Sequence, residues 1–220
     1  MYSALKNSYA PLAIRLGIGL LCGLAILGIG STGLLQQLEL NVYDGLLRSR
    51  PVVTVSHSRI TYITISEEDI RRQGRWPITD KTLVQALRLL LSYQPRAIGV
   101  DFYRDIEVPP GHKELMALLP KHPQIIVISQ LGGGTVARIP PPSILQGSPQ
   151  VGFNDILVDP DGLIRRALLF QDDGDEVASA FALKLATLYL AQDGIVPEQD
   201  PAMPEWIRLG RTTLPPFTAS

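Results

Sequence analysis

The sequence is almost free of cysteine, and this scarcity limits how the protein can be stabilised. Its 220 residues include a single cysteine, Cys22, so no disulfide can form within the chain. Cys22 lies inside an apolar run and is interpreted as a small buried apolar residue. The folded part must therefore be held together by its hydrophobic core rather than by covalent cross-links.

The chain also lacks any cluster of basic residues. Its 20 lysines and arginines are balanced by 21 aspartates and glutamates, which gives a net charge of −1. A protein that binds nucleic acid normally presents a concentrated positive surface to the phosphate groups. The composition argues against nucleic acid as a partner.

Motifs of catalysis and of cofactor binding are lacking as well. No GxSxG, HExxH or protein-kinase signature occurs, and His57, His112 and His122 do not have metal-ligand spacing. We therefore expect no enzymatic activity, no cofactor and no metal site in this chain. Catalytic groups that meet only in the folded state leave no such motif, so an enzyme stays open as a third class.

Two segments have only part of the pattern of a ligand-binding loop. The glycines at 132–134 follow a predicted strand, but no lysine and Ser/Thr pair follows, and prolines at 140–142 replace the helix that a phosphate loop needs. The acidic residues at 172–176 lack the alternating ligand positions and the distant glutamate of an EF-hand. Both segments are predicted to be solvated loops.

One long apolar run is the main positive feature of the sequence. Residues 16–35 include no charged side chain, and about twenty such residues match the roughly 30 Å hydrocarbon layer of a bilayer. We expect a transmembrane helix at 16–35, a cytoplasmic tail at 1–15, and the remainder on the periplasmic side of a bacterial inner membrane. The alternative is a cleaved secretory signal, although its apolar region is normally only about 7 to 15 residues long.

Gly19 and Gly23 form a GxxxG pair within this run. Because glycine has no side chain, such a pair lets two helices approach closely and pack by van der Waals contact. Homodimerisation through this face is therefore a hypothesis. Glycine is also common in membrane helices for other reasons, so the pair has an ordinary interpretation too.

The remainder has the length of one domain, and its pattern predicts an α/β fold. A juxtamembrane helix and linker are expected at 36–58, followed by an extracytoplasmic domain at 59–220. Strands are predicted at 60–65, 97–100 and 124–129, with helices from Thr79 to Pro95 and at 112–119 between them. This βαβ alternation predicts a parallel sheet with helices packed on it.

The pattern changes in the last third of the chain. Strands at 151–157 and 163–170, joined by a turn at 159–162 that contains proline and glycine, predict a later antiparallel hairpin. A helix at 177–190 and two short strands around Gly210 follow. The predicted fold class is α/β, with a mixed sheet, a parallel core and an antiparallel hairpin, preceded by one transmembrane helix.

Asp101 is the strongest candidate for a functional residue. It ends a predicted strand, and ligands of open α/β sheets bind beyond the carboxyl ends of the strands. The ordinary alternative is that Asp101 caps the following turn by accepting backbone hydrogen bonds. Trp76 either lines the same cleft or covers the core. Arg165 and Arg166 alternate on one predicted strand, so we expect only one of them to face a given pocket.

Several short motifs also occur in a fixed order along the chain. They are Tyr43-Asp44, Arg48-Ser49-Arg50-Pro51, Gly74-Arg75-Trp76-Pro77, Ile98-Gly99-Val100-Asp101-Phe102, Gly152-Phe153-Asn154 and Asp159-Pro160-Asp161-Gly162-Leu163-Ile164-Arg165-Arg166. Together they resemble the type-two CHASE domain, the cyclase and histidine-kinase associated sensory extracellular domain. The ligand-binding candidates are Trp76, Asp101, Asn154 and Arg165.

The resemblance implies a function in signal transduction. It implies an extracytoplasmic sensory domain of a membrane-bound bacterial receptor, truncated before its later membrane spans and its effector, whose signal is an unknown small molecule or protein. The alternative is a membrane-anchored structural or interaction module of the cell envelope that has no small-molecule ligand.

Overall fold

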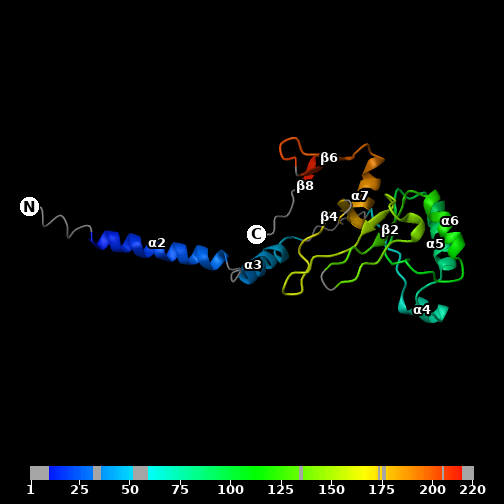
Figure 1. Cartoon of the computed structure of the whole chain (residues 1–220), viewed down its shortest axis with the longest axis horizontal. Coiled ribbons are helices and arrows are strands. Elements are labelled where there is room, and N and C mark those ends of the chain that lie inside the picture. Colours follow the sequence, from blue (N-terminus) through cyan, green and yellow to red (C-terminus); the bar gives the residue numbers. More distant parts are fainter. Residues whose placement is uncertain are drawn as a thin grey trace, which may run out of the picture. The chain divides into compact units, whose positions relative to one another are not determined.

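The computed structural model divides the chain into two units, Met1–Tyr62 and Ile63–Ser220, each described here by itself. The structure describes residues 10–31, 36–51, 59–133, 136–172, 174, 177–204 and 206–214. Helices and strands are numbered as in Figure 1. The first unit consists of helices, whereas the second contains all of the described strands.

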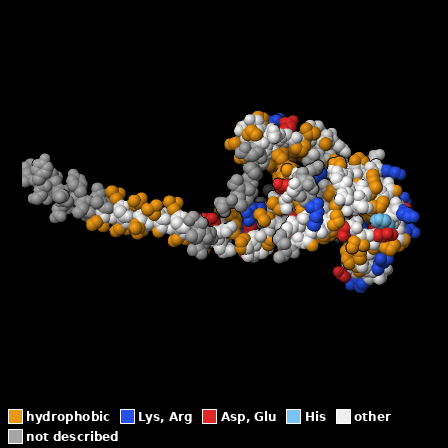
Figure 2. All heavy atoms as spheres, viewed as in Figure 1, with side chains coloured by type: hydrophobic (Ala, Val, Ile, Leu, Met, Phe, Trp, Pro, Cys, Tyr) orange, Lys and Arg blue, Asp and Glu red, His pale blue; other side chains and the backbone are white. Residues whose placement is uncertain are grey.

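The first unit contains two helices, α2 (Ala10–Ser31) and α3 (Gln36–Arg48). Hydrophobic side chains are exposed along α2, as Figure 2 shows. In α3, Leu38, Val42 and Leu46 recur every four residues, which places them on one face of the helix. The predicted helix after residue 35 is thus present.

The structure corrects the predicted transmembrane helix at 16–35. Among the described residues, no helix is both long enough and apolar enough to cross a membrane. The uncharged part of α2 extends only over 16–31, which is about 24 Å at 1.5 Å per residue and shorter than the roughly 30 Å hydrocarbon layer. The preceding part of the helix includes Arg15, and residues 32–35 lie outside the described part of the chain.

A parallel three-stranded sheet forms the centre of the second unit. Its strands are β1 (Ile98–Val100), β2 (Ile125–Ser129) and β3 (Val151–Phe153), in that order across the sheet. Val100 pairs with Val127, and Ser129 pairs with Phe153. All five residues of β2 are buried, as expected for the central strand of a sheet that is covered on both faces.

Two helices, α5 (Asp80–Ser92) and α6 (His112–Leu118), pack against each other and against one face of this sheet. The larger hydrophobic core lies between these helices and the strands; its buried members are Ile78, Leu83, Val84, Leu87, Ile98, Val100, Leu115, Leu118, Leu119, Ile125, Val127 and Leu145. Thr79 caps α5 by accepting a hydrogen bond from the Thr82 amide at 3.1 Å, as the sequence predicts. A shorter helix, α4 (Glu67–Gln73), precedes them and is capped by Ser66.

Helix α7 (Phe181–Ala191) covers the opposite face of the sheet. It approaches closely because the strands present glycines to it: a Cβ at Gly99 would lie 2.6 Å from the Phe181 ring, and one at Gly152 would lie 2.6 Å from the Phe181 Cα. The helix begins next to Ala180, which bridges to Phe153. It ends near Arg96, which donates to the Tyr189 carbonyl and binds Asp193. Helix α7 therefore runs antiparallel to the strands.

Antiparallel pairs complete the unit. Strands β4 (Phe170–Asp172) and β5 (Val177–Ser179) form one pair, and β6 (Pro197–Gln199), β7 (Ile207–Leu209) and β8 (Thr212–Leu214) form a second sheet. Single-turn 3₁₀ helices occur at Leu119–Lys121 and Ser143–Leu145. The two strands predicted around Gly210 are confirmed.

Three other predicted elements are wrong. Residues 60–65 form no strand. The predicted hairpin of 151–157 and 163–170 is reduced to one antiparallel bridge, Leu157–Arg166, because β3 belongs to the parallel sheet. The predicted helix at 177–190 begins at Phe181, since residues 177–179 pair with β4. In each case the β-branched or apolar residues of the segment did not show which other strand, if any, it would pair with.

Candidate functional site

Polar side chains from all three parallel strands meet at the carboxyl edge of the sheet. Tyr103 follows β1, Gln130 follows β2, and Asn154 follows β3. The Tyr103 hydroxyl lies 2.9 Å from Asn154 Oδ1 and 3.2 Å from Gln130 Oε1. The register of the sheet explains this contact. When the pairs Val100–Val127 and Ser129–Phe153 are continued past the strand ends, residue 103 lies level with residue 130, and residue 130 with residue 154. These three residues form the candidate site, which we call the edge triad.

A glycine-containing loop borders the edge triad. Residues 130 and 139 form a bridge, and Gly133 pairs with Val136 beyond it. Asp155 fixes the base of this loop: its carboxylate accepts the Leu131 amide at 2.8 Å and the Gly132 amide at 3.0 Å. Gly132 has φ +75°, a left-handed conformation that favours glycine. Asp155 thus attaches this loop to the sheet edge. The loop does not lead directly into a helix N terminus, as a phosphate-binding loop would.

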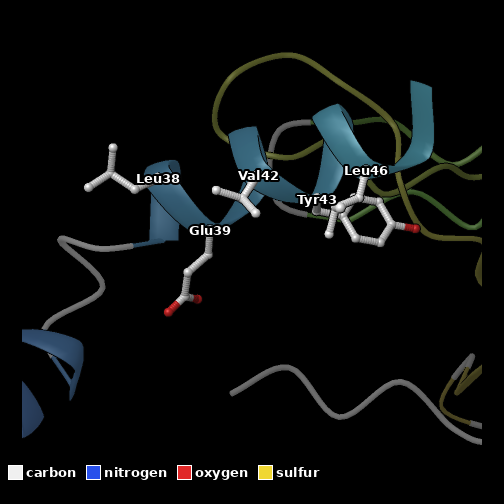
Figure 3. Close-up of a pocket in the computed structure, with 5 residues that line it drawn as sticks. All are labelled: Leu38, Glu39, Val42, Tyr43 and Leu46. Carbon is white, nitrogen blue, oxygen red and sulfur yellow. The ribbon is translucent and has the colours of Figure 1, made fainter. Parts of the chain in front are cut away.

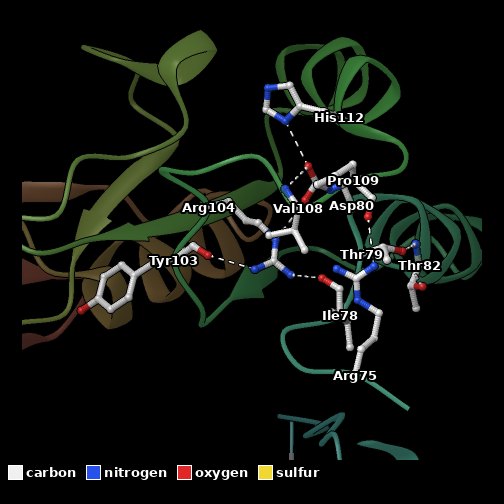
Figure 4. Close-up of polar contacts among 10 residues, drawn as sticks. All are labelled: Arg75, Ile78, Thr79, Asp80, Thr82, Tyr103, Arg104, Val108, Pro109 and His112. Atoms are coloured by element: carbon white, nitrogen blue, oxygen red, sulfur yellow. Dashed lines mark hydrogen bonds and ion pairs between the residues drawn. The ribbon is translucent and has the colours of Figure 1, made fainter. Parts of the chain in front are cut away.

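A buried ion pair lies next to the edge triad in sequence (Figure 4). Arg104 Nε and Asp80 Oδ1 are 3.2 Å apart, and their side chains are 6% and 0% exposed. Neither atom has a hydrogen-bond partner of good geometry, so the two groups attract each other as charges. Burial lowers the pKa of Arg104, while the nearby Asp80 acts in the opposite direction. The Arg104 guanidinium also lies over the Phe102 ring, 4.6 Å from its centroid.

The ion pair fixes the segment 103–112 to the first turn of α5. Arg104 donates to the Ile78 carbonyl at 2.9 Å and to the Tyr103 carbonyl at 3.0 Å. Asp80 Oδ2 accepts the Val108 amide at 3.2 Å and lies 3.0 Å from His112 Nδ1, whose side chain is 30% exposed. Figure 4 shows the Tyr103 ring pointing away from these groups. Tyr103 and Arg104 thus attach one segment to two different elements.

A second charged cluster stabilises the turn at 159–166. The Asp159 carboxylate is buried and binds Arg165 at 2.8 Å and also Arg166. Arg165 binds Asp161 as well, at 2.6 Å. Hydrogen bonds from Arg165 and Arg166 lower the pKa of Asp159 against the opposing effect of burial. The turn closes by a hydrogen bond from the Gly162 amide to the Asp159 carbonyl.

Comparison with protein families connects this geometry to a known group. The family model of the CHASE2 domain matches residues 21–219. The chain belongs to the CHASE2 family. CHASE2 domains are sensory extracellular domains of signal-transduction receptors. Searches of curated proteins and of solved structures found no match.

The CHASE2 match includes all four predicted ligand-binding residues, but the structure distributes them over different places. Asn154 belongs to the edge triad. Asp101 directly follows β1 at the same edge and is exposed. Trp76 precedes α5 and is 57% exposed, whereas Arg165 binds the two aspartates of its own turn. Whether any of them binds a ligand stays a prediction.

One expectation about the CHASE2 arginines is wrong. Arg165 and Arg166 were expected to face opposite sides, yet both bind the carboxylate of Asp159. Residues 163–165 and 167–169 form no regular strand, so strict alternation does not apply, and the long side chains reach the same acceptor. The sequence analysis also missed Tyr103, Gln130 and the Asp80–Arg104 pair. The one available signal was that Tyr103 and Gln130 each follow a predicted strand, as Asp101 does.

The first unit of this CHASE2 chain presents an open apolar surface. Leu38, Val42 and Leu46 line it together with Glu39 and Tyr43 on α3 (Figure 3). The three aliphatic side chains are more than 60% exposed. In α2, a Cβ at Gly19 or Gly23 would meet no atom within 4 Å. Dimerisation through these glycines stays a prediction.

Proposed function

We propose that this chain is a ligand-sensing domain that acts in the periplasm and reports a small molecule through a conformational change. Its membership of the CHASE2 family supports a sensory role. The observation that supports a ligand site is the edge triad, where one hydroxyl connects side chains from three parallel strands. The carboxyl edge is the usual ligand position of open α/β sheets.

The proposed signal begins with Tyr103. A ligand that competes for the Tyr103 hydroxyl or its partners would favour a different position of residue 103. The next residue, Arg104, holds Asp80 and the Ile78 carbonyl at the start of α5. A displacement of Tyr103 would therefore change how Arg104 packs against the start of α5. This proposal requires that the site and α5 share two discrete arrangements.

Thermal melting of the purified full chain across a panel of small molecules, ions and pH values is the first test. A ligand that binds only the folded state raises the protein's free energy of unfolding by RT ln(1 + [L]/Kd). Hydrogen–deuterium exchange with the best compound would then compare the edge triad with residues 78–92. Changed exchange at both places supports a sensor. Protection at the edge alone would contradict signalling through Arg104.

The test also separates the proposal from its alternative. A structural or interaction module would give no small-molecule shift and would instead co-purify with a stoichiometric protein partner. The exposed apolar face of α3 favours this second candidate, because exposed apolar patches mark interaction surfaces. We propose no catalytic activity for this chain, and a screen with ester and phosphate substrates would reveal one.

A further inference from the structure

Strand β1 has an open edge. Among the described strands, only β2 pairs with β1. Successive residues of a parallel strand direct their backbone groups to opposite edges, and Ile98 donates toward β2, to the Gln124 carbonyl at 2.8 Å. The N–H and C=O groups of Gly99 therefore point to the other edge. Gly99 is exposed although the Phe181 ring covers its face, so this edge is open to water.

The segment before α4 has the composition of a strand but pairs with none. Residues 60–65 read ITYITI, all β-branched or aromatic, which are the residue types that strands prefer. Ile60, Tyr62 and Ile63 are more than 60% exposed. Within the described part of the chain, the backbone of residues 61–65 makes no hydrogen bond. The segment thus exposes both the apolar side chains and the backbone groups that a sheet edge could pair.

The order of the elements favours the open edge of β1 as the place for this segment. Helix α5 lies between the segment and β1 in the chain, α6 connects β1 to β2, and both helices cover one face of the sheet. Crossover connections between parallel strands are almost always right-handed. Two successive right-handed crossovers over one face advance in the same direction across the sheet. A strand before α5 would therefore lie on the side of β1 that is away from β2.

The alternation of side chains agrees with this position. Ile65 packs against the larger core, to which Ile98 and Val100 of β1 belong. Residues two apart on a strand face the same side, so Ile63 would join Ile65 over this core. In the register that satisfies this condition, Ile63 lies level with Ile98, and Ile65 with Val100. The Gly99 amide would then donate to the Ile63 carbonyl, and the Ile65 amide to the Gly99 carbonyl.

We propose that residues 63–65 dock on the open edge of β1 as a fourth parallel strand, and that they exchange between this state and the unpaired one. Docking would bury Ile63 and pair the backbone groups of Gly99. It would also fix the chain that leads from α3 to the sheet, and undocking would release it. The edge of β1 is thus a switch between the N-terminal helices and the sheet. The proposal goes beyond the proposed function, because it requires no ligand.

Disulfide trapping in the full chain tests the docked register. In a Cys22→Ser background, Ile63→Cys with Ile98→Cys places two thiols on neighbouring strands. Such strands lie about 4.8 Å apart, within the Cα separation of about 4.4–6.8 Å that a disulfide accepts. Tyr62→Cys with Ile98→Cys is the matched control, because Tyr62 is also exposed but would face the opposite side. In the same glutathione buffer, we expect the first pair to close within one chain at least tenfold faster than the control pair.

Hydrogen exchange of the closed first pair shows whether backbone pairing accompanies the disulfide. The same variant after reduction is the reference. Closure should slow the amides of Gly99 and Ile65 at least tenfold. The Thr64 amide, which would point away from β1, should change by less than twofold.

The other outcomes overturn the proposal. Equal closure rates would show a segment without strand register, and closure without slower exchange at Gly99 would exclude backbone pairing. Disulfides between two copies would assign the edge to a second copy instead. If Ile98→Cys does not fold, Ala97→Cys reverses the test, because its side chain would face Tyr62→Cys and not Ile63→Cys. A melting shift with a small molecule is independent of all these results, so the sensory function stands or falls separately.

Discussion

The guanidinium of Arg104 and the carboxylate of Asp80 form an ion pair that is almost completely shielded from water, with Nε and Oδ1 3.2 Å apart. Two charges in this position attract strongly but have also lost their hydration, so the pair as a whole need not add stability. Its main effect is positional. It joins the segment after β1 to the start of α5, and either partner alone would be an uncompensated buried charge.

Replacement of Asp80 with alanine should therefore destabilise the protein severely. We expect a loss of about 3–5 kcal/mol in the free energy of unfolding, because Arg104 would stay buried without its partner. Urea denaturation of the full chain measures this loss. The matched control is Asp105→Ala, which removes an exposed carboxylate from the same segment and should change stability by less than about 0.5 kcal/mol. A loss below about 1 kcal/mol for Asp80→Ala would contradict the buried ion pair.

Acid should weaken the turn that Asp159 organises. The pKa of Asp159 is lowered in the folded state by hydrogen bonds from Arg165 and Arg166. A carboxyl group with a lowered folded pKa stabilises the protein above its unfolded pKa, near 3.8, and this contribution disappears as the pH falls through the folded pKa.

Denaturation midpoints between pH 6 and pH 3 check this prediction. Asp159→Asn should be less stable than the natural chain at pH 6 and should lose less stability on acidification. Part of the acid sensitivity will persist, since hydrogen bonds from Thr213 and from the amides of Ala202 and Met203 lower the pKa of Asp200 as well. If the denaturation midpoints of Asp159→Asn and of the natural chain fell equally with pH, Asp159 would not contribute to the acid sensitivity.

The glycines that face α7 should differ in their tolerance of alanine. At Gly152 the new methyl group would meet backbone atoms of Phe181, whereas at Gly99 it would meet the ends of the Phe181 and Leu185 side chains, which can rotate away. We expect Gly152→Ala to cost about 1–3 kcal/mol and Gly99→Ala to cost less. Gly45→Ala on α3 has open space and should stabilise its helix by about 0.5–1 kcal/mol. Thermal melting of the three variants gives the order, and equal losses for Gly99 and Gly152 would contradict it.

Loss of the Tyr103 hydroxyl should loosen the edge triad without unfolding the protein. Tyr103→Phe removes the bonds to Asn154 and Gln130 and should cost about 0.5–1.5 kcal/mol. Hydrogen exchange should increase at residues 101–104 and 130–132. Tyr93→Phe is the control, because Tyr93 is 76% exposed. Unchanged exchange in Tyr103→Phe would mean that this hydroxyl does not hold the strand ends together.

Two strands of the parallel sheet, β1 and β2, and the helices α5 and α6 could be predicted from sequence because their signals are local, whereas β3 was predicted in an antiparallel hairpin. Thr79 marks the start of α5, and the β-branched residues of 125–128 mark the central strand. The edge triad and the Asp80–Arg104 pair could not be predicted, since their partners lie 24 to 51 residues apart. Only the register of three strands brings them together. The pattern also misjudged residues 60–65, which form no strand, and residues 177–179, whose apolar pattern continues into α7 although they pair with the adjacent residues 170–172.

The adjacency of Tyr103 and Arg104 has a consequence for how this loop can change in length. Surface loops usually tolerate insertions and deletions, but these consecutive side chains bind the sheet edge on one side and the start of α5 on the other. One additional residue between them would force one attachment to break. Natural variation in loop length should therefore fall after Arg104 and before Val108, between the two positions at which the segment is fastened to Asp80.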